Sequence, residues 1–239
     1  METLPCEHDE RSSSGVTVGL IVLRSDEVLE RELGAWLPRD FRLLHTRIPN
    51  ATHVTAGSLL EMERDLPDAA RLLPPSVRFD VLAYGCTSAS TLIGEERVAE
   101  LIAGVVPGVA ITNPLSAAKA RFASLGVERI ALLTPYAPDI SRALVEHIES
   151  AGIEVRHAAT FDVRDDSRVA RITERSVLEA LVALGGREGC DAVFGSCTNL
   201  RAHGILEEAA RRVGKPVITS NSALAWHVER LARAAATSR

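Results

Sequence analysis

Short runs of aliphatic residues alternate along this chain with longer segments in which apolar and polar residues mix. The short runs are continuous and rich in Val, Ile and Leu, which is typical of parallel strands that helices cover on both faces. Eight runs are predicted to be strands: Val16–Leu23, Phe41–Thr46, Val81–Tyr84, Val109–Ile111, Ile130–Leu133, Glu154–Ala158, Ala192–Phe194 and Val217–Thr219.

The segments between these runs carry apolar residues at the spacing of a helix. Seven helices are predicted: Asp26–Trp36, Glu95–Ala103, Ser116–Leu125, Pro138–Ala151, Val169–Leu184, Gly204–Val213 and Ala223–Ala235. Two of them are followed directly by a glycine, Gly126 and Gly152, as is common where a left-handed residue ends a helix. Strands that alternate with helices predict an α/β protein.

The chain also contains an internal repeat, offset by the 111 residues that separate Cys86 from Cys197. Asp80-Val-Leu-Ala-Tyr-Gly-Cys-Thr87 matches Asp191-Ala-Val-Phe-Gly-Ser-Cys-Thr198. Two further pairs match: Gly19–Leu23 with Ile130–Thr134 at the same offset, and, roughly 25 residues after each cysteine, Ala110-Ile-Thr-Asn113 with Val217-Ile-Thr-Ser-Asn221. Any α/β chain repeats strands and helices, but that does not account for the shared Cys-Thr and the shared Asn.

The repeat predicts two pseudo-symmetric, Rossmann-like (flavodoxin-like) halves, each with a four-stranded, mostly parallel sheet and flanking helices. We expect residues 15–116 together with 220–239 to form the first half, and residues 117–219 the second. The polar and acidic residues 1–14 are predicted to form a disordered tail. The active site is then expected in the cleft between the halves.

Composition excludes several classes of partner. Of the 239 residues, 46% are hydrophobic and 25% charged, the balance of an ordinary globular protein. A net charge of −5 and scattered arginines argue against a nucleic-acid surface. No segment reaches the roughly 18 apolar residues that cross a bilayer, and the N-terminus has no signal-peptide pattern. We therefore expect a cytoplasmic protein that binds neither nucleic acid nor membranes.

The cysteines bear on cofactors as well as on compartment. Cys6, Cys86, Cys190 and Cys197 form no CxxC pair and no zinc-ligand spacing, so they are predicted to be free thiols and no metal site is expected. The sequence has no GxGxxG or Walker loop for a nucleotide and no GxSxG for a hydrolase. We accordingly expect no cofactor.

The repeated cysteines are the candidate catalytic residues. Ligands of open parallel sheets bind beyond the carboxyl ends of the strands, where Cys86 and Cys197 both lie. If the halves face each other, the two thiols lie on opposite sides of one cleft. They can then form an acid/base pair, in which one cysteine is a thiolate and the other a thiol. A single cysteine is more often a small buried hydrophobe. We keep that interpretation for Cys190 and place Cys6 in the tail, whereas the repeat favours catalysis by Cys86 and Cys197.

Small polar residues follow both cysteines. The loops that begin at Thr87-Ser88 and Thr198-Asn199 offer hydroxyl, amide and backbone N–H groups. Such groups can hold a carboxylate and can lower the pKa of a nearby thiol. Thr87, Ser88, Thr198 and Asn199 are therefore predicted to bind the substrate.

These residues support a resemblance to a known family. The segments Gly85-Cys-Thr-Ser88, Ser196-Cys-Thr-Asn199, Thr134-Pro-Tyr136 and Ser220-Asn-Ser-Ala-Leu-Ala-Trp226 resemble those of the aspartate/glutamate racemase superfamily. The resemblance is closest to its maleate isomerase and arylmalonate decarboxylase group. Within that group, Gly19-Leu-Ile-Val-Leu-Arg-Ser-Asp26 and Ser196-Cys-Thr-Asn-Leu-Arg201 resemble the ectoine-utilisation branch (EutA).

The resemblance implies an enzyme without cofactor or metal that acts on a small carboxylate. The racemases of this superfamily exchange a proton between two cysteines, and its maleate isomerases add the first cysteine to a double bond. Its arylmalonate decarboxylases keep only the second cysteine, as proton donor. Both are present here, as Cys86 and Cys197. The resemblance also implies that Tyr136 hydrogen-bonds a substrate carboxylate. From the residues alone, a structural role in capping the loop after Leu133 is an equally good interpretation of Tyr136.

Two acidic residues depart from the maleate isomerase pattern, which carries asparagines at these positions. Asp26 and Asp166 would repel a dicarboxylate where an amide would bind it, and they favour a substrate that also carries an ammonium group. Asp26 is equally interpreted as the N-cap of the predicted helix that follows it.

The predicted function is therefore a two-cysteine isomerase or racemase of a small carboxylate, with an amino acid as one candidate substrate and a role in ectoine degradation implied by the resemblance. One alternative is a carbon–carbon lyase of the arylmalonate decarboxylase type that uses Cys197 as proton donor. The other is a non-catalytic ligand-binding homologue. We also expect a homo-oligomer.

Overall fold

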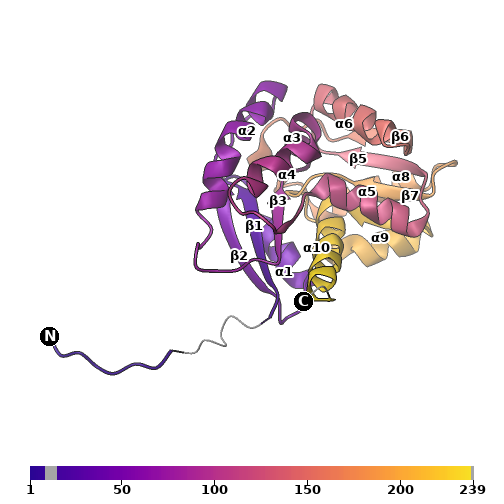
Figure 1. The fold of residues 1–239 in the computed structure, drawn as a ribbon. Helices are drawn as coiled ribbons and strands as arrows, with labels where there is room; N and C mark the ends of the chain where they lie inside the picture. The colour runs from indigo at the N-terminus through magenta and orange to yellow at the C-terminus, as the bar shows by residue number, and fades with distance from the viewer. Residues whose placement is uncertain (9–14, 238–239) are drawn as a thin grey trace.

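The structure is a computed structural model that describes residues 1–8 and 15–237 (Figure 1). The predicted disordered tail over residues 1–14 falls in part on residues 9–14, which lie outside the described residues. Residues 1–8 are exposed and contain no helix or strand. No described helix combines the length and the hydropathy that crossing a membrane requires.

The elements follow one another as the alternating pattern predicts. The strands are β1 (Thr17–Leu23), β2 (Arg42–Ile48), β3 (Val81–Gly85), β4 (Ala110–Thr112), β5 (Arg129–Thr134), β6 (Glu154–Thr160), β7 (Ala192–Gly195) and β8 (Val217–Thr219). The helices are α1 (Leu29–Trp36), α2 (Ala56–Arg71), α3 (Thr87–Ile93), α4 (Glu95–Ala103), α5 (Pro114–Leu125), α6 (Pro138–Ser150), α7 (Asp166–Val169), α8 (Glu174–Gly185), the 3₁₀ turn η2 (His203–Ile205), α9 (Leu206–Val213) and α10 (Ser220–Thr237).

The strands form two parallel sheets, as predicted. Their orders are β2-β1-β3-β4 and β6-β5-β7-β8, so the second sheet repeats the first with every strand moved on by four. All pairs of neighbouring strands are parallel. The repeat in the sequence is thus a repeat of the fold, and the two four-stranded units with flanking helices confirm the predicted fold class.

Burial explains the hydrophobic pattern. The interior strands β1, β3 and β7 are buried along their whole length, and β5 is buried except at its first residue. The outer strands β2 and β6 mix exposed and buried positions. Helices cover both faces of the interior strands, so these strands carry continuous aliphatic runs.

The sequence patterns missed two helices of the first half. In α2, Leu59, Met62 and Leu66 are buried at helical spacing, but Pro67 inside the helix obscured the pattern. α3 is formed by the Thr- and Ser-rich segment that the composition predicts to be a loop, because these side chains compete for backbone hydrogen bonds. In the structure the Ser90 hydroxyl instead donates one turn back, to the Cys86 carbonyl at 2.6 Å.

The bounds of most predicted helices differ from the observed ones by a few residues. The helix predicted over Val169–Leu184 begins only at Glu174, as α8, because Thr173 caps α8 by accepting the Ser176 N–H at 3.1 Å; Val169 is the last residue of the short helix α7. α10 begins at Ser220, directly after β8 and three residues before the predicted start. Gly126 ends α5 in the left-handed conformation, as predicted.

Helices of both halves meet around one carboxylate, that of Glu95 at the start of α4. It accepts hydrogen bonds from the Ser116 hydroxyl (2.5 Å), the Lys119 ammonium and the His147 ring (3.0 Å), which lie on α5 and α6. Burial alone would raise the pKa of Glu95, but these donors outweigh burial and hold the pKa below its ordinary value. Nearby, α5 and α10 pack against each other. The exact division of the chain into halves stays a prediction.

Candidate active site

Cys86 lies where β3 ends and α3 begins. Its backbone is extended and its Sγ atom accepts the Ala89 N–H at 3.4 Å, so the thiol caps α3. The residue before it is a glycine, and a Cβ atom at Gly85 would lie 2.3 Å from Cδ2 of Leu29 and 3.3 Å from the Ile21 carbonyl oxygen. The absence of a side chain at Gly85 thus lets the Leu29 side chain of α1 pack directly against the end of β3.

Cys197 follows β7 in the second half. Its φ of 125° lies in a region that side chains with a Cβ atom rarely adopt. The Cys197 N–H donates to the Ser220 hydroxyl at 3.0 Å. Backbone strain at a candidate catalytic residue indicates that the surrounding contacts impose the conformation.

Hydroxyl groups tie the two cysteine loops together. The Ser220 oxygen that accepts the Cys197 N–H also hydrogen-bonds the Thr87 hydroxyl at 2.8 Å. The Thr198 hydroxyl donates to the Gly85 carbonyl at 3.3 Å. Each loop therefore contacts the other half directly, next to its cysteine.

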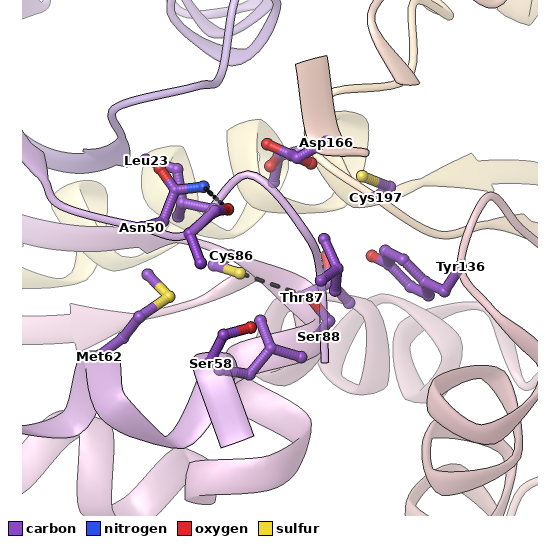
Figure 2. Close-up of a pocket in the computed structure, with 14 residues that line it drawn as sticks. Leu23, Asn50, Ser58, Met62, Cys86, Thr87, Ser88, Tyr136, Asp166 and Cys197 are labelled. Atoms are coloured by element: carbon purple, nitrogen blue, oxygen red, sulfur yellow. Dashed lines mark hydrogen bonds between the residues drawn. The ribbon is translucent and has the colours of Figure 1, made fainter. Parts of the chain in front are cut away.

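Both cysteines line one cavity, which they reach from different halves (Figure 2). Its volume of about 20 Å³ is room for about one water molecule. The lining residues come from both halves and from the segment that joins β2 to α2: Leu23, Asn50, Ala51, Val54, Ser58, Leu59, Met62, Cys86, Thr87, Ser88, Tyr136, Asp166, Cys197 and Thr198.

Two loops form a roof over this cavity, residues 49–55 of the first half and 161–165 of the second. His53 and Asp165 form an antiparallel bridge, with the Val54 N–H donating to the Arg164 carbonyl at 2.9 Å. The Asp166 N–H donates to the Thr52 carbonyl at 3.2 Å. A substrate larger than water does not fit the cavity as it stands, so its binding requires the lining to rearrange.

Both thiols are neutral in this closed state. Burial raises the pKa of the Cys86 thiol to about 11, although the Ala89 N–H and the Ser88 hydroxyl lower it. Burial, and after it the negative charge of Asp166, raises the pKa of the Cys197 thiol well above its ordinary value. In this state each thiol keeps its proton, and a thiolate would form only when the surroundings change.

Asp166 and Tyr136 are the polar groups beside Cys197 (Figure 2). Burial raises the pKa of Asp166, against hydrogen bonds from Ser25 and Asn199 that lower it. Ser25 donates to Asp166 Oδ2 and in turn accepts from the Asn50 amide at 2.8 Å. Burial also raises the pKa of Tyr136 well above its ordinary value, so its phenol is protonated and able to donate a hydrogen bond.

Two predicted substrate-binding residues lie outside the cavity lining. Asp26 Oδ1 accepts the N–H groups of Val28 and Leu29, both at 2.8 Å, in the turn before α1, whose N-cap residue is Val28. Asn199 joins the halves: its Oδ1 accepts the Glu27 N–H at 3.0 Å, and its Nδ2 donates to the Asp166 carbonyl at 2.9 Å. The other predicted residues, Cys86, Thr87, Ser88, Tyr136, Asp166, Cys197 and Thr198, all line the cavity.

Sequence reasoning missed the residues of the roof and of α2. Asn50 follows β2 closely, so the carboxyl-end rule that found the cysteines could have found it. Ser58 and Met62 depend on recognising α2, which Pro67 obscured. Within residues 1–8 and 15–237, no three His, Cys, Asp or Glu side chains are grouped as metal ligands would be.

Two matched parallel sheets with a cysteine-lined cavity between them define the class of this α/β protein. The chain belongs to the arylmalonate decarboxylase family, because the sequence profile of that family matches residues 76–239. Its relatives include a maleate isomerase of Alcaligenes faecalis, 27% identical over 226 residues that cover 88% of this chain and 87% of that protein. This confirms the predicted resemblance to the maleate isomerase and arylmalonate decarboxylase group; the ectoine-utilisation branch stays a prediction.

Solved structures of both kinds of enzyme share the fold. A Cys-to-Ser mutant of the Nocardia farcinica maleate cis-trans isomerase, with a covalently bound succinylcysteine intermediate, has a TM-score of 0.79 at 25% identity and covers 90% of this chain and 92% of that chain. A double mutant of arylmalonate decarboxylase in its liganded form has a TM-score of 0.80 at 25% identity, over 91% of this chain and 92% of that chain.

The strain at Cys197 predicts an unusual order of stabilities. At position 197, Cys197→Gly should be more stable than Cys197→Ala by about 1 kcal/mol or more, because only glycine adopts this φ without cost. At position 86, where φ is −148°, Cys86→Ala should be more stable than Cys86→Gly by about 0.5–1 kcal/mol. Urea unfolding of the four variants measures both differences, and an alanine that is the more stable at both positions contradicts the strain.

Asp26 predicts a pH dependence of stability. Burial raises its pKa from 3.8 to about 6, and no donor of the described residues reaches Oδ2 with hydrogen-bond geometry, although the nearby Thr198 hydroxyl lowers the pKa. The folded state then binds more protons than the unfolded state, so stability falls as the pH rises from about 4 to about 6. Asp26→Asn keeps an oxygen for the Val28 and Leu29 N–H groups and should remove this loss, up to about 3 kcal/mol.

The measurement is the free energy of unfolding of wild type and Asp26→Asn at pH 4, 5, 6 and 7. The matched control is Asp165→Asn, because hydrogen bonds from Ser167 hold the pKa of Asp165 below its ordinary value and its linkage has the opposite sign. Parallel pH profiles for wild type and Asp26→Asn would mean that Asp26 is ionised at no cost in the folded protein.

Proposed function

We propose that this protein is a cofactor-independent isomerase or racemase that acts on a small carboxylate through Cys86 and Cys197. The observation that carries the proposal is that both thiols line the same buried cavity, each at the carboxyl end of an equivalent strand. One thiolate removes a proton from a substrate carbon, and the thiol on the other side returns a proton to it, so that the protons balance. The decarboxylase alternative would need Cys197 alone.

The chemistry requires that one thiol loses its proton when the substrate binds. Asp166 is a cause of the raised pKa of Cys197, and a substrate ammonium group beside Asp166 would offset that negative charge. The cationic group of the substrate would thus lower the pKa of the Cys197 thiol at the moment of binding. This supports a zwitterionic substrate over a plain dicarboxylate.

The substrate carboxylate has donors of its own in the cavity. The protonated Tyr136 phenol and the Ser88 hydroxyl both line it. Hydrogen bonds from neutral donors hold a carboxylate without adding charge to the site. A diamino acid of ectoine breakdown, as the resemblance implies, is a candidate to test first.

The two-cysteine mechanism predicts that each thiol is essential. Cys86→Ser and Cys197→Ser should each lose about 10²–10⁴-fold in turnover, the usual contribution of a positioned acid or base. Cys190→Ser is the matched control, because this buried thiol lies near Lys215 and outside the cavity lining. The assay is solvent deuterium uptake at the substrate carbon, followed by NMR over amino acids, hydroxy acids and maleate.

Other results of these assays would support a different function. Release of carbon dioxide from a malonate that needs Cys197 but not Cys86 would establish the lyase instead. Binding of a carboxylate without deuterium uptake, isomerisation or carbon dioxide release would establish a non-catalytic homologue. Wild-type turnover in either cysteine variant would remove that cysteine from the mechanism.

Asp166 should select the charge of the substrate. A close opposite charge in a partly dry site favours an ammonium-bearing substrate by about tenfold to a hundredfold. Asp166→Asn should therefore lower kcat/KM for amino acids and raise it for maleate, while the exposed neighbour Asp165 provides the control variant Asp165→Asn. A wild type that already prefers maleate, or equal losses in both variants, contradicts this selection.

A further inference from the structure

The carboxylate of Glu32, on α1, is buried without a cationic partner. The residue is 5% exposed and forms no ion pair with a described residue. Its Oε1 atom accepts the backbone N–H groups of Ala202 and His203 at 2.7 and 2.8 Å. Its Oε2 atom accepts the Asn221 amide at 2.8 Å. Three donors from the second half and from α10 thus converge on one anion of the first half.

These donors hold the loop that carries Cys197, residues 197–203. Asn221 Nδ2 donates both to Glu32 and to the Thr198 carbonyl at 2.9 Å. At the far end of the loop, Glu32 binds Ala202 and His203 directly. One carboxylate therefore fixes the loop at its start, through Asn221, and at its end.

The chemistry of this contact suits a carboxylate and no other side chain. All of the hydrogen-bond partners of Glu32 among the described residues are donors, so an oxygen is needed at both Oε positions. In Glu32→Gln one of these oxygens becomes an NH₂ group facing the Asn221 NH₂. Rotation of the Asn221 amide would remove the contact between the two NH₂ groups, but it would break the hydrogen bond from Asn221 to the Thr198 carbonyl. The substitution thus loosens the loop beside Cys197 and changes side-chain volume little.

We propose that Glu32 is a positioning residue that fixes the Cys197 loop and thereby sets the place of the Cys197 thiol in the cavity. This rests on the proposed function of Cys197. Glu32 lies outside the cavity lining, so it acts through the loop and touches no substrate. It explains how the strained backbone of Cys197 is maintained: Ser220 and Asn221 hold one side, and Glu32 holds Asn221 and the other side.

The test measures the reactivity of each thiol separately, which needs no substrate. Wild type, Glu32→Gln and Glu30→Gln are treated with iodoacetamide, and alkylation of Cys197 and Cys86 is followed by mass spectrometry of their peptides. Glu30 is the matched control, because it lies on the same helix and binds Arg47, away from the Cys197 loop. Cys197 in Glu32→Gln should react about tenfold faster or more, the factor carried by one charge-assisted hydrogen bond. Cys86 should change less than about twofold, well below that factor.

A second variant guards against a failure of Glu32→Gln to fold. Asn221→Ala removes the donor to Oε2 and to the Thr198 carbonyl but leaves the two backbone amides on Oε1. It should also accelerate alkylation of Cys197 over Cys86. If activity is established, both variants should lower kcat more than they raise KM.

The outcomes are distinct. Unchanged alkylation of Cys197 in folded Glu32→Gln and Asn221→Ala overturns the proposal. An equal rise at Cys86 and Cys197 also overturns it, because Glu32 would then support only global stability. Absence of any isomerase activity in wild type would defeat the proposed function and leave the thiol measurement standing.

Discussion

The hydroxyl of Ser220 joins the loops that carry the two thiols. Each cysteine follows a strand of its own sheet, and among the described residues no strand pairs across the two sheets. Ser220 accepts the Cys197 N–H and hydrogen-bonds the Thr87 hydroxyl, so one buried group contacts both cysteine loops. Hydrogen bonds of buried groups in a setting of low dielectric constant are strong and directional. The geometry of the site is therefore set at the junction of the halves.

The junction of the halves contains buried carboxylates that no cation of the described residues neutralises. Asp26, Glu32 and Asp166 are buried, and none of them forms an ion pair with a described residue. Glu32 compensates with three donors, but Asp26 and Asp166 have raised pKa values because burial outweighs their hydrogen bonds. A buried charge without a full set of donors is costly, and sites that keep one usually use it. The ammonium group of the proposed substrate would bring positive charge to this junction.

The fold could be predicted from the sequence because interior parallel strands are buried on both faces and so leave continuous aliphatic runs. The repeat added the division into two sheets and placed Cys86 and Cys197 at equivalent positions. The roof could not be predicted, since the bridge between His53 and Asp165 joins loops far apart in the chain and has no periodic pattern.

The roles of Asp26 and Asn199 show a different limit. Both follow a strand, where a short polar side chain caps a backbone as readily as it binds a ligand. In the structure Asp26 accepts backbone N–H groups in the turn before α1, and Asn199 bonds to Glu27 and Asp166. Residue type and position do not separate these uses; only the placement of neighbouring N–H and carbonyl groups does.

Closure of the roof joins these electrostatic features to selectivity. The bridge consists of a few backbone hydrogen bonds between loops with many exposed residues, so opening it costs little compared with unfolding either sheet. When the roof closes over a substrate, water leaves and every charge in the cavity interacts more strongly. A second carboxylate beside Asp166 would then destabilise the closed state, whereas an ammonium group would stabilise it. Discrimination between substrates would thus act on closure itself, before any bond to carbon changes.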